Sequence, residues 1–422
     1  MPKNKIQRFE YSVIRVGEEG FSDSHFFELV RLNERHNNKY FSIGNKCIYF
    51  TQYVGVIQVG NLTIEILPKA DIGEGDFNKW QSAFINMLRV SRLLHFYSPT
   101  YADLKIRNAS LLDIFFETFI SEVELLIRLG LVKKYRLTER NAGFLKGKLL
   151  FPQNVKYNSI HAERFYTQHQ IYDSNNIFNQ IITAAVRVLP RVLSNSILLD
   201  KVKNILINLQ EIDDIRITSD HFDNLVFDRK SNAYKRAILI SKMILMNYSP
   251  DIVGGQYNIL SLLFDMNEVF ERYVYYILKD AASEFEYRDV QIKGQVSRKF
   301  WNHKTIRPDI IVDLNNGGQA DRIIIDTKWK VLKQPYPSDT DLKQMYAYNL
   351  HFGAKRSFLL YPKVYDNEYY SGSFYISEGV KGEFENHQCN LYFLDMFDGN
   401  SLKKDLGKII LKSLIGEKIK IL

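Results

Sequence analysis

The first part of the chain alternates apolar and polar residues as β-strands do, with helical periodicity between the strand-like runs. A Gly-Asn pair joins the apolar runs Val54–Val59 and Leu62–Leu67, which predicts a hairpin. Apolar residues at helical spacing predict helices over Trp80–Tyr97 and Leu111–Leu129. Strand character then returns in Val132–Phe151. We therefore expect a β-rich N-terminal domain, barrel-like or sandwich-like, with helical insertions.

The middle of the chain has helical periodicity, and the last third mixes helices with apolar strands. The region from about Asn175 to Tyr248 carries its apolar residues at helical spacing. Beyond it the pattern predicts a helix, two strands separated by an Asn-Asn-Gly-Gly turn, a second helix and a third strand. These elements are Phe264–Leu278, Asp309–Leu314, Arg322–Trp329, Asp341–Phe352 and Arg356–Lys363.

Together these elements predict an α+β protein of two or three domains, since a domain has about 150 residues and the chain has 422. We expect a β-rich N-terminal domain over residues 1–165, a helical connecting segment over 166–255 and a C-terminal α/β domain over 256–422. No linker rich in Pro, Gly or Ser separates these parts, and no internal repeat is present.

Composition is typical of a soluble globular protein, with 45% hydrophobic and 25% charged residues. Two cysteines far apart, Cys47 and Cys389, argue against a disulfide framework or a zinc site. Neither a signal peptide nor a long apolar run is evident, so a cytoplasmic location without a membrane partner is expected. The net charge of +8 favours contact with phosphate backbones.

Half of that excess charge lies in Ser401–Leu422, where six lysines meet two acidic residues. Apolar residues at near-helical spacing predict an amphipathic helix there. Its lysines could contact DNA, or they could form an ordinary solvated face over a core contact.

The strongest chemical signal is a pair of aspartates with a lysine on two neighbouring strands. Asp309 follows Pro308, and Asp326 precedes Lys328 by two residues. Because side chains alternate along a strand, Asp326 and Lys328 project from one face, which Asp309 can reach from the adjacent strand. Oxygen ligands of this kind suit Mg²⁺, with the main-chain carbonyl of Thr327 as a further ligand. A surface hairpin with an ordinary Asp–Lys pair is the alternative.

This spacing resembles the PD-(D/E)xK nuclease superfamily. The resemblance implies that one or two Mg²⁺ ions assist phosphodiester hydrolysis, with Lys328 orienting the attacking water or balancing charge. It also implies that Glu271, on the preceding helix, joins the metal site, although a solvated helix carboxylate is an equal alternative. Gln344 and Tyr348 lie one helical turn apart and can touch the scissile phosphate or a metal-bound water; the alternative is a core-facing Tyr348 and a surface Gln344.

Four segments, in order along the chain, resemble the McrC family, the nuclease subunit of McrBC-type modification-dependent restriction systems. They are Tyr53–Lys69, Gly130–Asn158, Gln170–Val186 and the series from Phe264 to Tyr348 that holds the aspartates and the lysine. The resemblance implies an N-terminal domain that docks on a hexameric AAA+ GTPase of the McrB type. It also implies a C-terminal restriction-endonuclease-like domain that cuts double-stranded modified DNA.

The chain has no G-x-x-x-x-G-K-[ST] phosphate loop, so a nucleotide-driven motor must come from another chain. The resemblance implies that a segment of this chain enters the partner's central pore and stimulates GTP hydrolysis. The polar, basic and hairpin-like region Arg136–Lys148 is a candidate for that segment, and a plain exposed loop is the alternative.

Two other functions fit the pattern. The first is a scaffold and GTPase activator that binds but does not cut, although the intact set of Asp309, Asp326 and Lys328 favours the nuclease. The second is a stand-alone repair or recombination nuclease of the same superfamily, which leaves the first 250 residues without a role.

Overall fold

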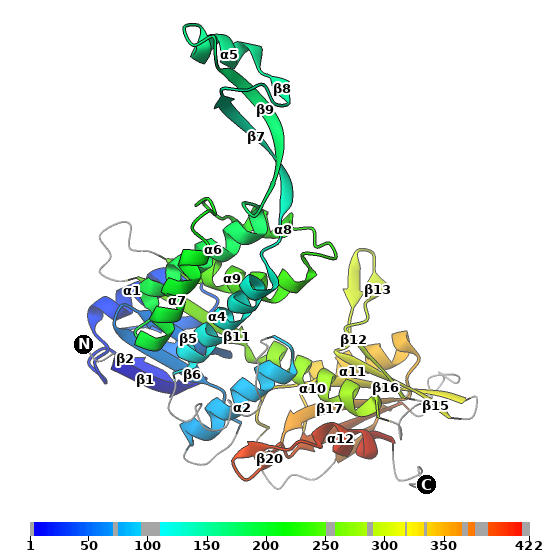
Figure 1. The fold of residues 1–422 in the computed structure, drawn as a ribbon. Coiled ribbons are helices and arrows are strands. Elements are labelled where there is room, and N and C mark those ends of the chain that lie inside the picture. The colour runs from blue at the N-terminus through cyan, green and yellow to red at the C-terminus, as the bar shows by residue number, and fades with distance from the viewer. Residues whose placement is uncertain are drawn as a thin grey trace. The chain divides into compact units, whose positions relative to one another are not determined.

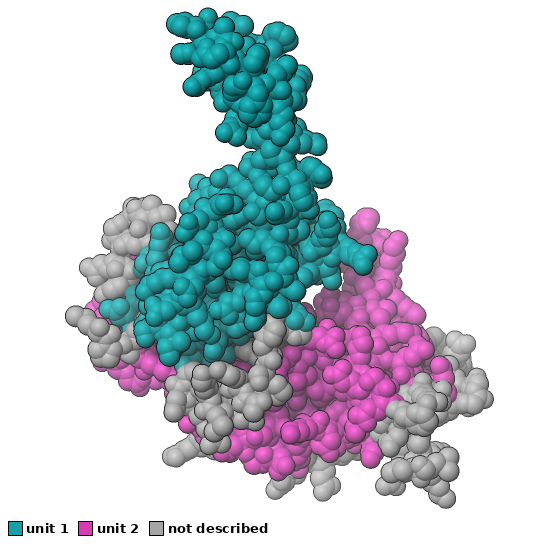
Figure 2. All heavy atoms as spheres, viewed as in Figure 1, with its two compact units in different colours: residues 1–3, 58–61, 109–262 teal, residues 4–57, 62–108, 263–422 magenta. Residues whose placement is uncertain are grey.

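The computed structural model describes residues 4–70, 75–93, 110–249, 258–284, 290–316, 319–332, 336–364, 370–375 and 387–415. The chain forms two compact units (Figure 2). Unit 1 comprises residues 1–3, 58–61 and 109–262, and unit 2 comprises residues 4–57, 62–108 and 263–422. Each unit is discontinuous in sequence, so the two units do not test the expected domains. The domains over 1–165, 166–255 and 256–422 stay predictions.

The N-terminal part of unit 2 contains three neighbouring strands of a five-stranded sheet. Strand β1 (Asn4–Phe9) pairs in parallel with β6 (Leu62–Leu67), whose other neighbour is β5 (Tyr53–Val59). Every residue of β5 and β6 is buried, so their apolar runs fill a core rather than alternate. The Gly-Asn turn between β5 and β6 lies where the hairpin was predicted.

A second, three-stranded sheet and two helices complete this part of unit 2. The sheet has the order β2-β4-β3, and the helices are α1 and α2. Their bounds are Val13–Arg15 for β2, Phe41–Gly44 for β3, Cys47–Phe50 for β4, Asp23–Arg35 for α1 and Phe77–Val90 for α2. Both helices begin at side-chain caps, Ser22 and Asp76.

The described strands form open sheets and no closed barrel, so the barrel-like N-terminal domain predicted from the sequence is wrong. Strand β1 lies at the edge of its sheet and pairs only with β6. A barrel requires the first and last strands to pair with each other, and strand alternation alone does not reveal whether they do. The predicted helix over Trp80–Tyr97 ends at Val90, and residues 94–97 lie outside the described residues.

The C-terminal part of unit 2 is a six-stranded mixed sheet with helices on both faces (Figure 1). The strand order is β12-β15-β16-β17-β19-β18, with β16, β17 and β19 parallel and the other pairs antiparallel. The strands are β12 (Val290–Gly294), β15 (Ile310–Asn316), β16 (Gln319–Thr327), β17 (Arg356–Pro362), β18 (Tyr370–Ser373) and β19 (Gln388–Leu394). The predicted strands over 309–314, 322–329 and 356–363 correspond to β15, β16 and β17, although β16 ends at Thr327.

Three helices cover this sheet. Helix α11 (Asp339–Phe352) packs on one face through Met345, Tyr348 and Phe352, against Ile311 and Ile324 of the central strands. Helix α10 (Met266–Ala282) packs against β12 and β16 and against α12 (Leu406–Ile415). The helices predicted over 264–278 and 341–352 are therefore present, and the predicted tail helix is present as α12, with residues 416–422 outside the described part.

Two short strand pairs also belong to unit 2. The first is the hairpin of β13 (Arg298–Trp301) and β14 (Lys304–Ile306), and the second is β20 (Phe397–Asp398) with β21 (Ser401–Leu402). The Asn-Asn-Gly-Gly turn predicted between β15 and β16 includes residues 317 and 318, which lie outside the described residues.

Unit 1 consists of packed helices that carry a long two-stranded arm (Figure 1). Its helices are α4 (Leu111–Leu129), α6 (Ile177–Val192), α7 (Ser196–Asn208), α8 (Ser219–Asp223), the 3₁₀ turn η1 (Asn232–Tyr234) and α9 (Lys235–Asn247). The middle of the chain is thus helical as predicted, and it ends in β10 (Tyr248–Ser249), which pairs with β11 (Ile259–Asp265).

The arm comprises residues 134–173. Strands β7 (Lys134–Ala142) and β9 (Phe165–Asp173) pair antiparallel along their whole length. Strand β8 (Lys148–Leu149) and helix α5 (Phe151–Asn158) lie at its far end (Figure 1). The arm is rich in exposed large apolar side chains: Tyr135, Leu137, Phe144, Leu145, Phe151, Val155, Tyr157, Ile160 and Tyr172. None of the described helices is both long and apolar enough to cross a membrane.

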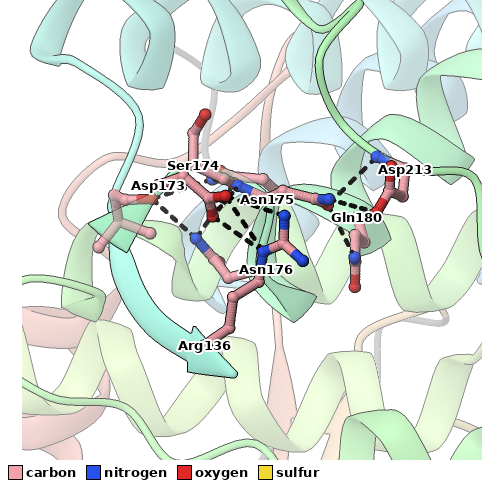
Figure 3. A network of polar contacts seen from close by, with 9 residues as sticks. Arg136, Asp173, Ser174, Asn175, Asn176, Gln180 and Asp213 are labelled. Atoms are coloured by element: carbon pink, nitrogen blue, oxygen red, sulfur yellow. Dashed lines mark hydrogen bonds and ion pairs between the residues drawn. The ribbon is translucent and has the colours of Figure 1, made fainter. Parts of the chain in front are cut away.

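A polar network fixes the base of the arm to the helices of unit 1 (Figure 3). Arg136 on β7 donates to both carboxylate oxygens of Asp173 at 2.9–3.1 Å. Asp173 accepts from the backbone N–H of Asn175 at 3.1 Å, and the Asn175 side chain bonds Gln180 on α6 and the backbone and side chain of Asp213. The polar residues of the segment Gln170–Val186 therefore set the direction in which the arm leaves the helices.

Candidate active site

The register of β15 and β16 brings the two predicted aspartates opposite each other. Ile310 pairs with Ile325 and Ile311 with Ile324 in this antiparallel ladder. Continuing the same register by one residue places Asp309 opposite Asp326 at the end of the strand pair. Directly opposite residues of an antiparallel pair have Cβ atoms about 5 Å apart. The apolar pattern that fixes the register therefore also fixes the separation of the two carboxylates.

Asp309 is held from the neighbouring strand. Thr327 donates to Asp309 Oδ2 through both its backbone N–H, at 2.7 Å, and its hydroxyl, at 2.8 Å. Burial raises the pKa of Asp309, while the two bonds from Thr327 and the nearby charge of Lys328 oppose that rise. Thr327 therefore orients the Asp309 carboxylate, and a role for its carbonyl as a metal ligand stays a prediction.

Asp326 and Lys328 form the centre of the cluster. Asp326 is 2% exposed, and its Oδ2 lies 2.6 Å from Lys328 Nζ. Burial and the negative charge of Asp309 raise the pKa of Asp326 to about 7. Burial also disfavours the charged lysine, but the carboxylates of Asp326 and Asp341 outweigh it and raise the pKa of Lys328. Lys328 is thus an ammonium group at neutral pH.

Helix α11 completes the polar shell with Gln344 and Tyr348. Gln344 accepts from Lys328 Nζ at 3.3 Å and donates to Asp326 Oδ1 at 3.4 Å. It also donates to the Tyr348 hydroxyl at 2.7 Å, which in turn donates to the carbonyl of Arg307 at 3.0 Å. Gln344 and Tyr348 lie one turn apart on α11, and Tyr348, at 6% exposure, is a core residue whose hydroxyl bonds Gln344.

One residue that the sequence did not single out also belongs to this cluster. Asp341, on the first turn of α11, lies 3.5 Å from Lys328 Nζ and 2.6 Å from Lys330 Nζ. Its only sequence signal is the pairing with Ser338, whose hydroxyl accepts from the Asp341 backbone N–H, and this pattern indicates a helix start rather than a site. Glu10 accepts a 2.7 Å hydrogen bond from the indole of Trp329, the residue after Lys328.

Glu271 lies on α10, and its carboxylate accepts from Gln295 Nε2 at 2.8 Å. Burial and then the negative charge of Asp309 raise the pKa of Glu271, so this carboxylate lies near the aspartates. Within the described part of the chain, no three or more His, Cys, Asp and Glu side chains are grouped so as to hold a metal ion. A role for Glu271 in metal binding therefore stays a prediction.

The donor set fits a hard divalent cation with few protein ligands. Asp326 Oδ2 is buried and accepts no well-oriented hydrogen bond from any described residue, despite its proximity to Lys328. Asp309 and Asp326 supply only oxygen ligands, and the raised pKa of each reflects incompletely compensated negative charge. Mg²⁺ is commonly held by one or two carboxylates, with water and substrate phosphate completing its shell. The residues present match that pattern.

Solved structures share this fold. A chain in the Thermococcus gammatolerans tetradecameric assembly of McrB AAA+ hexamers with bound McrC matches with a TM-score of 0.70 at 20% identity, over 97% of this chain and 99% of that chain. The Thermococcus gammatolerans McrBC complex matches with a TM-score of 0.50 at 21% identity, over 67% of this chain and 89% of that chain. No curated protein matches by sequence. These two matches show that the chain has the same fold as chains of those assemblies.

The family model of the McrBC 5-methylcytosine restriction system component matches residues 48–362. This range covers most of the chain and includes the arm, Asp309, Asp326 and Lys328. The chain belongs to this family. The resemblance to the McrC type that its motifs indicated is confirmed.

Proposed function

We propose that this protein is the DNA endonuclease subunit of an McrBC-type restriction complex, which cuts modified foreign DNA in the cytoplasm in a Mg²⁺-dependent reaction. The observation that carries the proposal is the convergence of Asp309, Asp326, Lys328 and Gln344 at the end of one strand pair. Family membership supports a restriction role.

Each residue of the cluster has a role in this proposal. Asp309, Asp326 and the carbonyl of Thr327 hold the cation, and Glu271 is a further candidate ligand. Mg²⁺, when bound, stabilises charge on the scissile phosphate and activates the attacking water. Lys328, kept as an ammonium by its carboxylate neighbours, orients that water or offsets the transition-state charge. Gln344 positions the side chains of Lys328 and Asp326 through one hydrogen bond to each, and it reaches the scissile phosphate.

We also propose that the arm binds a hexameric AAA+ GTPase of the McrB type, enters its central pore and stimulates GTP hydrolysis. The two solved structures that share this fold are McrB AAA+ hexamers with bound McrC and an McrBC complex. Nine exposed large apolar side chains in 40 residues make the arm a surface that needs a partner. The arm includes the polar, basic region Arg136–Lys148.

The nuclease is tested with Lys328→Ala and Asp326→Ala in the full chain, assayed with the partner GTPase, GTP, Mg²⁺ and methylated duplex DNA. We expect loss of cleavage of at least about a hundredfold, because both changes remove charge from the reacting centre. Partner binding and GTPase stimulation should stay at the parental level. Lys403→Ala is the matched control. Lys403 Nζ lies 2.7 Å from Asp395 Oδ2, and this ion pair is not part of the cluster. Parental cleavage by both variants would refute the site.

The arm is tested separately with Phe144→Ser and Leu145→Ser, each of which removes an apolar side chain that is 59% exposed near its far end. Both should weaken GTPase binding and stimulation while leaving the fold intact. Ile207→Ser is the control, because Ile207 is 61% exposed on α7 rather than on the arm. Cleavage without any partner would favour a stand-alone repair or recombination nuclease. GTPase stimulation without cleavage by the parental chain would favour the non-cleaving scaffold.

A further inference from the structure

The β13–β14 hairpin (residues 298–306) is an exposed element between the edge strand β12 and the catalytic strand β15, and it projects from the sheet of unit 2 (Figure 1). All residues from Arg298 to Thr305 are exposed. A register shift between Lys299 and Trp301 twists the hairpin, and Asn302 at its tip adopts a positive φ of 46°. Packing in the core therefore does not account for the residues at its tip.

The charge of this segment has one sign. Residues 290–308 contain five cations and no acidic residue. The cations are Lys293, Arg298, Lys299, Lys304 and Arg307. Lys293 pairs with Asp313 at 2.7 Å, but within the described residues neither Lys299 nor Lys304 has a hydrogen-bond or ion-pair partner. A segment of this composition attracts a polyanion.

Trp301 adds an apolar ring to this cationic tip. Its side chain is 66% exposed, whereas the two other tryptophans, Trp80 and Trp329, are 0% and 4% exposed. Exposing an indole to water is unfavourable, so a large aromatic side chain at a hairpin tip commonly marks a contact surface. An aromatic ring between lysines matches the chemistry of a nucleic acid, which offers phosphates beside sugar and base surfaces.

The root of the hairpin is part of the candidate active site. Gln295, just before the hairpin, donates its backbone N–H to the carbonyl of Asp309 at 2.9 Å and its side-chain amide to Glu271 at 2.8 Å. Just after the hairpin, the carbonyl of Arg307 accepts from Tyr348 at 3.0 Å. The hairpin is therefore anchored to residues of the site at both ends.

The base of the hairpin is also braced against α11. Arg298 donates to the carbonyl of His351 at 2.6 Å, and its guanidinium lies 4.7 Å from the centre of the Phe352 ring. The Phe300 ring meets His351 edge-on at 5.1 Å. These contacts use the base residues and leave Trp301 and the lysines at the tip for a ligand.

We propose that the β13–β14 hairpin binds duplex DNA beside the scissile phosphate, with Lys299 and Lys304 on backbone phosphates and Trp301 against the groove. The inference rests on the proposed nuclease function and names the element that holds the substrate. Lys304 precedes Asp309 by five residues. At about 3.3 Å per residue Lys304 lies within about 17 Å of Asp309, or about five base pairs of DNA at 3.4 Å each. Asn302 at the tip, seven residues before Asp309, lies within about 23 Å, or about seven base pairs.

Binding is measured in the full chain carrying Lys328→Ala, with a fluorescein-labelled 30-base-pair methylated duplex, by anisotropy at several salt concentrations. Adding Lys299→Gln and Lys304→Gln should lower the slope of log K against log salt by about 1.8, since each phosphate contact contributes about 0.9. Trp301→Ala should weaken binding roughly fivefold or more, as loss of an aromatic contact to a nucleic acid does. Lys201→Gln with Lys203→Gln on α7 is the charge-matched control.

Trp301 also provides a spectroscopic signature that does not depend on the energy of binding. Because Trp80 and Trp329 are buried, iodide should quench mainly Trp301, and DNA should protect it. A probe attached after Asn302→Cys should map within about seven base pairs of the cut. Labelling at that position is selective because Cys47 and Cys389, both free, are buried.

The outcomes separate this inference from the nuclease proposal. If the parental chain cleaves DNA but the hairpin variants bind and cut at parental levels, the hairpin inference is overturned and the nuclease stands. If the chain binds DNA through the hairpin but does not cleave with Mg²⁺, the nuclease proposal fails and the hairpin inference stands. If the hairpin variants lose only GTPase binding, the hairpin faces the protein partner and the inference is overturned. A parental chain that neither binds nor cuts DNA overturns both.

Discussion

Glu10 supplies a test of how the two halves of unit 2 are joined. Its side chain is 6% exposed and accepts from Trp329 Nε1 at 2.7 Å and from the backbone N–H of Lys69 at 2.9 Å. Burial raises its pKa from 4.5 to about 8, and the nearby carboxylate of Asp265 adds to the rise. Glu10 Oε2 has no hydrogen-bond donor among the described residues. At neutral pH the folded protein therefore holds Glu10 as an uncharged acid.

The sign of the pH effect follows from proton binding. Between pH 4.5 and about 8 the folded state keeps a proton on Glu10 that the unfolded chain loses, so the free energy of unfolding falls as the pH rises. Below pH 4.5 Glu10 is protonated in both the folded and the unfolded state, so it no longer lowers the free energy of unfolding. At about 1.36 kcal/mol per pH unit, the rise from 4.5 to about 8 sets an upper limit of about 5 kcal/mol for the loss.

Glu10→Gln removes the titration and keeps an oxygen for Trp329 and Lys69. We expect the variant to match the parent at pH 4.5 and to exceed its free energy of unfolding by about 2 kcal/mol or more at pH 8, because a buried unpaired charge is costly. Urea unfolding, followed by tryptophan fluorescence, measures the difference, since Trp80 and Trp329 are buried in unit 2 with ring centroids 6.3 Å apart.

The matched control is Glu65→Gln. Glu65 is also fully buried, but Lys5 Nζ lies 2.9 Å from its carboxylate, so the change should destabilise the protein through loss of the ion pair. The reasoning about Glu10 would be refuted if the difference between Glu10→Gln and the parent were the same at pH 5 and pH 8. A variant less stable than the parent at pH 8 would show that Glu10 is held as a compensated carboxylate.

Three further predictions follow from single contacts. Asp341→Asn removes a carboxylate 3.5 Å from Lys328 Nζ, and steady-state cleavage assays should show a roughly tenfold loss with unchanged partner binding, as for loss of one charge interaction. A double-mutant cycle of Arg136→Ala and Asp173→Ala should give a coupling of about 1 kcal/mol in urea unfolding of unit 1, since the pair is bidentate but about a third exposed. Gly407→Ala should destabilise unit 2 by about 2 kcal/mol or more in thermal unfolding, because a Cβ there would overlap the backbone of α10.

Part of the candidate site could be read from the sequence because its chemistry follows strand periodicity. Asp326 and Lys328 are two residues apart, so a strand must present both on one face. Gln344 and Tyr348 are four apart on a helix, and their 2.7 Å hydrogen bond follows from that spacing. Asp309 could be placed on the neighbouring strand because the turn between the two strands is marked by Asn and Gly residues.

Asp341, and contacts of residues close to the site, could not be read in this way. Asp341 lies in the first turn of a helix, as many surface aspartates do, and only the packing of α11 on the sheet brings it to Lys328. Glu10 precedes Trp329 by 319 residues, and their contact depends on how the N-terminal strands fold against the C-terminal sheet within unit 2. Lys299 and Trp301 become candidates for substrate binding only in the folded protein, where Gln295 at the root of their hairpin bonds Asp309 and Glu271.

The order of apolar and polar residues alone predicted β15, β16, β17, α10, α11 and α12 of the C-terminal part, and it placed Asp309, Asp326 and Lys328 on one strand pair. It did so because helix and strand periods are local properties of the backbone. Only the tertiary structure decided that β1 joins β6 in parallel in an open sheet, and that the arm is clamped by Arg136 and Asp173. Those features depend on contacts between residues far apart in the chain. The spacing of apolar residues within one segment does not specify which distant segment will pack against it.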